Sequence, residues 1–197
     1  MKHNQVKIKY EGQKIVLDIE TGDFLIVCNG RWPLARAIKR VTYLKDKQLV
    51  ALRAHHTGVF LVSDVSTIVR EMDYDRENKR LGDQFTVWSG NKYQNGQAKD
   101  RKLVLMKPIK PYPDPHALQR DLETWRGPYS VRILFAHLWR RLTGRDVSPG
   151  GRGHVCSGFT AAKVNKHYKE YFENPRMVSP REFMEGIMAD FDVYILN

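Results

Sequence analysis

A cluster of prolines divides the chain into two parts with different periodicity. Its members follow one another closely: Pro108, Pro111, Pro113 and Pro115. Proline fixes φ and lacks a backbone donor, so this segment can continue neither a strand nor a helix interior. Before it, apolar and polar residues alternate as in strands, and after it, apolar residues recur every three or four positions as in helices. We therefore predict an α+β fold with a β-rich half over about 1–107 and a helical half over about 114–190.

Turn and capping residues place the individual elements. We expect strands over 6–10, 13–19, 24–28, 48–53, 57–62, 66–72, 85–88 and 101–106, and a short C-terminal strand over 191–196. One helix is expected around 32–41, others begin after the caps Asp114, Ser130 and Ser179, and one begins near Cys156. The segment 89–100 has the composition of a loop. A length of 197 residues fits a single domain over 1–197.

The charge balance predicts an anionic partner. The chain has 33 Lys and Arg against 22 Asp and Glu, a formal charge of +11, and 42% hydrophobic residues, enough for a core. Such a basic surface suits nucleic acid, an acidic membrane face or an anionic cell-wall polymer, or it serves only solubility. Without a secretory or membrane-spanning segment in the sequence, we expect a cytoplasmic protein, with a phage or virus product or a machine-delivered protein as alternatives.

Two cysteines have very different surroundings. Cys28 ends an apolar run and is expected to be a buried core thiol. The number and spacing of the cysteines argue against a disulfide framework and a zinc site, and we expect neither metal nor cofactor. Cys156 instead follows the glycine-rich segment 150–153 at the expected first turn of a helix. The unpaired N–H groups and the dipole at such a position favour an anion, so Cys156 is the candidate nucleophile.

A cysteine nucleophile needs a base and a group that orients the base. His56 opens a predicted strand, and Gly58 on that strand would let a helix or substrate come close. His55 is a rival base, and His154 could raise the local positive potential. Glu71, on the next predicted strand, would share a face with His56 if the two strands pair antiparallel. Taken singly, each of these residues has an ordinary structural explanation, such as a core thiol or a solvent-facing acid.

The order of the motifs resembles the permuted branch of the NlpC-type papain-like superfamily, which includes the YiiX-type proteins and relatives of lecithin retinol acyltransferase. The matching pieces span roughly 20–190: Gly22-Asp23 before an apolar strand, His56-x-Gly58, an apolar strand carrying Glu71, Cys156-Ser157-x-Phe159, and Ser179-Pro180. In the usual papain-like order the cysteine precedes the histidine. Here the order is reversed, as in a permuted member.

The resemblance implies a circularly permuted papain-like fold, in which a mostly antiparallel sheet packs against the helix that bears the nucleophile. It implies a thiol-dependent hydrolase with Cys156 as nucleophile, His56 as base and Glu71 as orienting acid. The implied substrate is an amide in a peptide or peptidoglycan stem, as for a cysteine peptidase or amidase, or alternatively a lipid ester or thioester, as for an acyl hydrolase or acyltransferase. Two further classes stay open: a basic nucleic-acid-binding module, and a structural protein that keeps the shell without turnover.

Overall fold

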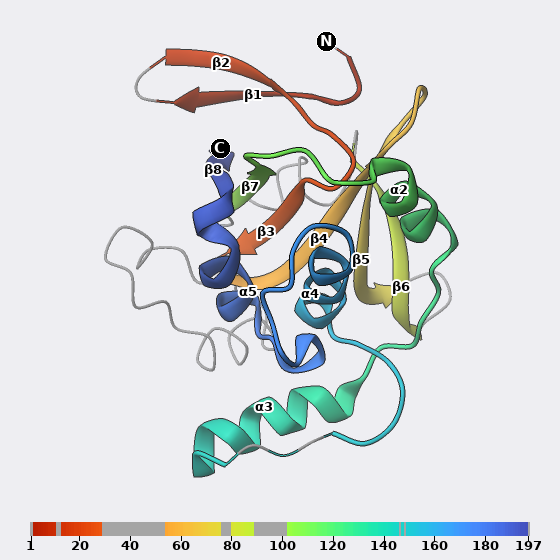
Figure 1. Cartoon of the computed structure of the whole chain (residues 1–197), viewed down its shortest axis with the longest axis vertical. Coiled ribbons are helices and arrows are strands. Elements are labelled where there is room, and N and C mark those ends of the chain that lie inside the picture. Colours follow the sequence, from red (N-terminus) through yellow and green to blue (C-terminus); the bar gives the residue numbers. More distant parts are fainter. Residues whose placement is uncertain are drawn as a thin grey trace.

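The computed structural model of the chain describes residues 2–10, 13–28, 54–75, 80–88, 102–145, 147 and 149–196. Three predicted segments lie outside these residues: the helix around 32–41, the strand over 48–53 and the loop over 89–100. Each of the other predicted strands and helices is present (Figure 1).

The strands are β1 (Gln5–Tyr10), β2 (Gln13–Asp18), β3 (Phe24–Cys28), β4 (Ala54–Val62), β5 (Thr67–Asp75), β6 (Arg80–Val87), β7 (Lys102–Pro108) and β8 (Phe191–Leu196). The α-helices are α2 (Pro115–Thr124), α3 (Val131–Thr143), α4 (Cys156–His167) and α5 (Pro180–Ile187), and the short 3₁₀ turns are η1 (Pro175–Met177) and η2 (Met188–Asp190).

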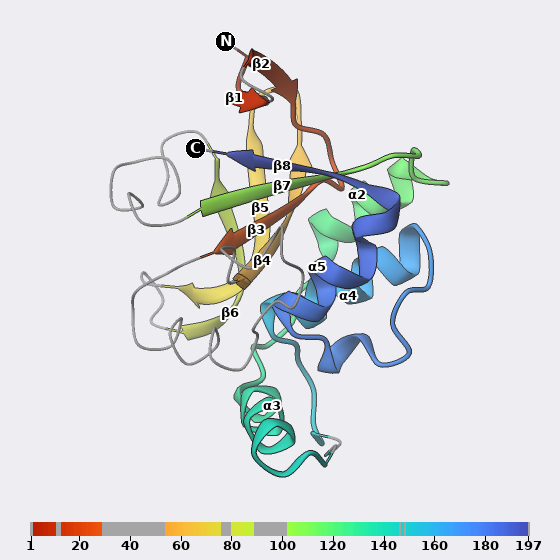
Figure 2. The same cartoon turned by 90° about the vertical axis from the view of Figure 1, so that its left-hand side faces the viewer.

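Six strands form one antiparallel sheet in the order β6-β5-β4-β3-β7-β8, and β1 and β2 form a separate antiparallel hairpin. Helices α2, α4 and α5 lie to one side of the large sheet (Figure 2). The expected α+β class with an antiparallel sheet is therefore confirmed. The C-terminal strand β8 joins the edge next to β7, which brings the two ends of the described chain onto neighbouring elements.

The central strand β3 is buried along its whole length because both of its faces are covered. Phe24 and Ile26 belong to the core between the sheet and the helices. Leu25 and Val27 belong to a second core, which includes Ile8 of the hairpin. Successive side chains of a strand point to opposite faces, so a strand covered on both sides reads as a continuous apolar run.

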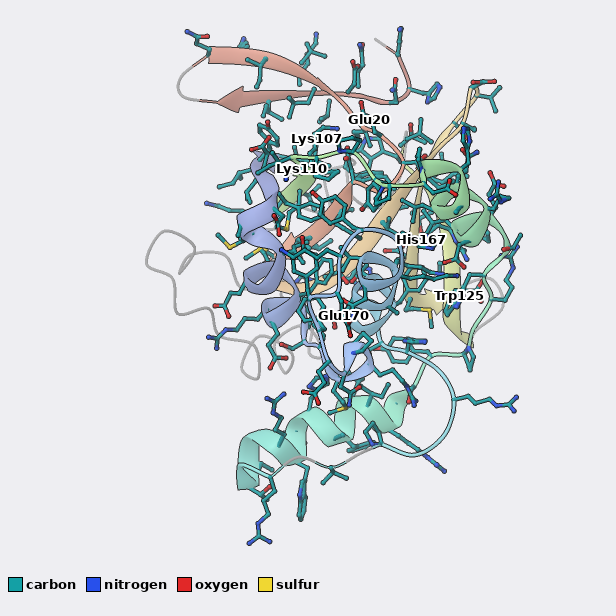
Figure 3. All side chains as sticks on the ribbon, in the orientation of Figure 1. Glu20, Lys107, Lys110, Trp125, His167 and Glu170 are labelled. Carbon is teal, nitrogen blue, oxygen red and sulfur yellow. The ribbon has the colours of Figure 1, made fainter. Side chains whose placement is uncertain are left out.

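The Gly22-Asp23 motif fixes the entry into β3. Gly22 has a φ of +97°, and a side chain there would collide with the ring of Tyr112, whose hydroxyl donates to the Gly22 carbonyl at 2.7 Å. The Asp23 carboxylate is buried and accepts from the Glu20 amide at 2.9 Å and from Lys107 Nζ at 2.7 Å. Lys107 and Glu20 are labelled in Figure 3. Burial raises the pKa of Asp23 to about 6, although Lys107 acts to lower it.

Candidate active site

The candidate nucleophile occupies the first residue of α4. Val155 is the extended N-cap, and its carbonyl accepts the first helical hydrogen bond, from the Phe159 amide at 2.9 Å. The helix itself therefore offers no carbonyl partner to the backbone N–H groups of Cys156, Ser157 and Gly158. These donors and the helix dipole favour negative charge at the position of the Cys156 side chain.

The glycine-rich approach to α4 has a steric cause. Gly153 has a φ of +106°, and a Cβ at this position would lie 2.5 Å from the Pro128 carbonyl oxygen. The neighbouring His154 exchanges backbone hydrogen bonds with this same segment: its amide donates to Pro128 at 3.1 Å, and its carbonyl accepts from Ser130 at 2.9 Å. The segment before α4 is therefore hydrogen-bonded to the residues that precede α3, and glycine is required at position 153, where the backbones of these two segments meet.

Side chains of the first turns hold α4 against its neighbours. Ser157 Oγ donates to the Val178 carbonyl at 2.6 Å. On the sheet side, Thr160 and Thr57 pair through their buried hydroxyls at 3.0 Å, which ties the helix to the residue that follows His56 in β4. Gly158 faces the η1 turn so closely that a Cβ there would lie 2.9 Å from the Arg176 carbonyl oxygen. The position of the nucleophile is thus set by contacts on two sides.

Strand pairing places His56 beside Glu71. In the antiparallel β4–β5 pair, Gly58 lies opposite Glu71, so His56, two residues earlier, is a diagonal neighbour on the same face. His56 Nε2 lies 2.6 Å from Glu71 Oε2. Glu71 is 1% exposed, and its other oxygen accepts from Thr86 Oγ1 at 2.5 Å. The carboxylate therefore has a fixed orientation, with one oxygen on the imidazole.

The side chain of Cys156 lies near the same imidazole, close enough to act on the pKa of His56. Because Glu71 contacts Nε2, Nδ1 is the ring nitrogen that remains for another partner. Burial alone would lower the pKa of His56, but the effects of Cys156, together with those of Glu71, raise it well above 6.5. The structure thus brings Cys156, His56 and Glu71 together, with the imidazole between the thiol and the carboxylate.

The two secondary histidine candidates take other places. His55 is buried beside an irregularity in the β3–β4 register, and the contacts with Glu71 and Cys156 are made by His56. The ring of His154 packs edge-on against Trp125. Burial, helped by nearby cationic side chains, lowers the pKa of His154 below 6.5. A lowered pKa favours the neutral ring, and the expectation that His154 raises the local positive potential stays a prediction.

Gly58 also differs from expectation. A Cβ on Gly58 would lie 2.5 Å from Val69 Cγ1 and 3.3 Å from the Arg70 carbonyl oxygen, both on the adjacent strand β5. The glycine is thus required by the sheet itself, rather than by an approaching helix or substrate. Close strand packing at this point keeps His56 and Glu71 within hydrogen-bonding distance.

The two thiols differ as predicted in their surroundings. Cys28 is completely buried in the core, and burial raises the pKa of its thiol to about 12, against a smaller opposing effect of Lys102. Cys156 keeps 5% exposure, and the side chain of its partner His56 keeps 14%. The Cys156–His56 pair therefore lies just beneath the surface, while Cys28 offers an unreactive internal reference.

Sequence reasoning missed the residues that support the site from behind. No sequence pattern identifies Thr86, because its hydrogen bond to Glu71 depends on the register of β5 against β6. On the helical side, the buried Lys163 lies 2.9 Å from Asp121 of α2, which also holds His167 Nε2 at 2.7 Å. The side chain of His167 lies between α4 and α2 in Figure 3. Lys163 and His167 are four residues apart and therefore lie on one face of α4, and this spacing was the sequence signal that both could contact one acidic residue.

Within the described residues, no group of three or more His, Cys, Asp or Glu side chains could hold a metal ion. No helix in the described part of the chain is long and apolar enough to cross a bilayer. A scan against protein-family models and a search of curated proteins found no match to this chain.

Proposed function

We propose that this protein is a thiol-dependent hydrolase that acts through an acyl-enzyme, on a circularly permuted papain-like fold of the NlpC type. One observation carries the proposal: the thiol at the first residue of α4 lies near His56 and acts on its pKa, and the buried carboxylate of Glu71 holds Nε2 of the same ring. A nucleophile, a base and an orienting acid in this arrangement define a nucleophilic triad. The antiparallel sheet packed against α4 agrees with the fold that the motif order implies.

Each member of the triad has one chemical task. The Cys156 thiolate attacks a carbonyl carbon, and the His56 imidazolium donates its proton to the leaving group as the thioester acyl-enzyme forms. His56 then removes a proton from water, which attacks the thioester and releases the acid and the thiol. Glu71 holds the ring and stabilises its charge. The backbone N–H of Cys156 supports the oxyanion, and one such donor typically contributes ~10²–10³ in rate.

The first candidate substrate is an amide in a peptide or a peptidoglycan stem, as the family resemblance implies. The second candidate is an ester or thioester of a lipid. A specific observation favours the second: α3, whose buried face packs against the N-cap residue Val155, exposes large apolar side chains on its other face. The net charge of +11 suits an anionic wall polymer as well as an acidic membrane.

The reactivity of the thiol can be tested without knowledge of the substrate. The protein is treated with an iodoacetamide probe over a pH series, and modification is located by peptide mass mapping. We expect Cys156 to be alkylated well below pH ~8.5, where a free thiol reacts slowly, and Cys28 to remain unmodified in the folded protein. His56→Ala should slow the reaction at Cys156 near neutral pH. Alkylation of Cys156 that follows the pH dependence of an ordinary thiol would contradict the proposal.

Turnover is tested with a panel of an activated ester, a stem-peptide amide and an acyl thioester. Hydrolysis should be abolished by Cys156→Ala, and intact-mass measurement should detect an acyl adduct on the wild type after rapid quenching. Cys28→Ser serves as the matched control, because it changes the other thiol while leaving the triad in place. Full activity in Cys156→Ala would exclude the mechanism.

A further inference from the structure

Helix α3 stands apart from the sheet (Figures 1 and 2), and an ion pair of Arg140 with Glu182 at 3.1 Å joins it to α5. One narrow face of it is buried: Ile133 and Ala136 pack in a small cluster with Val155 and Met177. This cluster joins α3 to the residue before Cys156 and to the η1 turn. The helix is therefore anchored beside the nucleophile by one side only.

The opposite face of α3 is apolar and exposed. Its members, with their exposed fractions, are Val131 (43%), Phe135 (66%), Leu138 (44%), Trp139 (52%) and Leu142 (73%). Their spacings of three, four and seven residues place them in one stripe along the helix. An ordinary surface helix has a single apolar face, directed at the core. A second apolar face of this size, open to solvent, marks an interaction surface.

The stretch of sequence that contains this stripe is strongly basic. Helix α3 contains no acidic residue, and Asp146 is the only one in the sequence between Glu123 and Glu170. Basic residues occur throughout the same stretch: Arg126, Arg132, Arg140, Arg141, Arg145, Arg152, Lys163, Lys166 and Lys169. Among these, Arg126, Arg132, Arg145, Arg152, Lys166 and Lys169 are exposed in the structure. Arg126, Lys166 and Lys169 form ion pairs with Asp83, Asp121 and Asp190, respectively.

We propose that α3 is an interfacial helix that docks the protein on an anionic lipid bilayer, with its axis parallel to the membrane surface and its apolar stripe among the acyl chains. Helices that bind this way combine Trp, Phe and Leu on one face with arginine and lysine around it. Anionic lipid headgroups complement the basic stretch, and each basic side chain near the surface strengthens binding. A second copy of the chain fits less well, because pairing through α3 would bring two basic stretches together.

This docking does not depend on the chemistry at Cys156. Combined with the proposed function, it carries one consequence for the substrate. The buried and exposed faces of α3 are separated by the helix itself, about 10 Å across. The N-cap residue of α4 would then lie about one helix diameter from the membrane. An acyl group or peptide attached to the bilayer could reach the triad across this distance.

Vesicle co-sedimentation tests the docking directly. The full chain is mixed with vesicles of phosphatidylcholine, with and without phosphatidylglycerol, at low and high salt. We expect binding to the anionic vesicles that weakens as salt rises, and little binding to the neutral ones. The double variant Phe135→Ser/Leu142→Ser should bind ~30- to 100-fold more weakly, because two inserted apolar side chains are lost. Both side chains are exposed, so circular dichroism should show an unchanged fold.

Two controls separate this proposal from its rivals. Val65→Ser/Ile109→Ser removes exposed apolar side chains away from α3 and should leave binding unchanged. Cys156→Ala should bind as the wild type does, so that failure of the hydrolase proposal would leave this one standing. Equal binding by wild type and the Phe135→Ser/Leu142→Ser variant would overturn the proposal. So would a wild-type dimer in sedimentation velocity that this variant converts to monomer, without any vesicle binding.

Discussion

Removal of the charge on Glu71 is the most direct perturbation of the site. Glu71 is buried, with Oε2 on His56 Nε2 at 2.6 Å and Oε1 on the Thr86 hydroxyl at 2.5 Å. Glu71→Gln keeps the shape of the side chain. The Thr86 hydroxyl can accept a hydrogen bond from the NH₂ of the new amide, so that the amide oxygen can accept from His56 Nε2. The substitution therefore removes a charge while the geometry is retained.

The size of the effect follows from the hydrogen bond that loses its charge. A hydrogen bond to a charged group contributes about 1.5–3 kcal/mol, and 1.36 kcal/mol corresponds to one pKa unit. Against the lowering effect of burial, Cys156 and Glu71 hold the pKa of His56 well above 6.5. In Glu71→Gln the pKa of His56 should fall by about 1–2 units. At neutral pH, less imidazolium then stabilises the thiolate, and alkylation of Cys156 should slow about 10- to 100-fold.

The assay is the rate of iodoacetamide alkylation at Cys156 as a function of pH. In Glu71→Gln the onset of reactivity should move to higher pH, since the thiolate has lost part of its support. The alkaline limb of the turnover profile should move to lower pH, because His56 loses its proton earlier. Glu170→Gln, the same change of charge at an exposed position, is the matched control. Thr86→Val keeps the charge and should have a smaller effect. An unchanged pH profile in a folded Glu71→Gln protein would refute the assigned role of Glu71.

Three further predictions concern the scaffold. Gly158→Ala should lower the free energy of unfolding by about 1–3 kcal/mol, since its Cβ would meet the Arg176 carbonyl oxygen at 2.9 Å; an unchanged melting temperature would contradict this. Burial raises the pKa of Asp23 to about 6, against 3.8 in the unfolded chain, so the folded state binds the proton more tightly. The free energy of unfolding should therefore fall by about 3 kcal/mol as the pH rises from about 4 through 6. Urea unfolding should show this pH dependence in the wild type and not in Asp23→Asn. Arg70→Met should lower the free energy of unfolding by about 2–5 kcal/mol, because the buried guanidinium donates to two backbone carbonyls at the end of α2. Wild-type thermal stability in Arg70→Lys would show that the forked geometry of the guanidinium is not needed.

Signals that act over three or four residues were sufficient to place most elements. Asp114 caps α2 by accepting from the Ala117 amide at 2.8 Å, and the Ser179–Glu182 capping box of α5 has both of its hydrogen bonds. Ser130 precedes α3 as expected, although its side chain makes no capping hydrogen bond. Such patterns are legible in the sequence because the interacting groups are close along the chain. The alternation of apolar and polar residues that predicted the strands also involves only residues close together in the sequence.

Contacts between distant segments could not be derived in this way. A preference for His56 over His55 could be argued from the motif with Gly58, but the contact with Glu71 depends on the register of β4 against β5. Thr86 became visible only when β6 was paired with β5. A register shift by one residue turns every side chain of a strand to the other face, and local sequence does not specify it.

By itself, the sequence determined where strands give way to helices, that Cys28 is a core residue, and that Cys156 begins a helix, because each of these is decided by neighbours along the chain. Only the tertiary structure decided that this helix start meets the imidazole of His56. That meeting depends on α4 lying against β4, where Thr160 and Thr57 share a buried hydrogen bond. The two sides of the contact come from the β-rich and the helical halves of the chain, which meet only in the folded state.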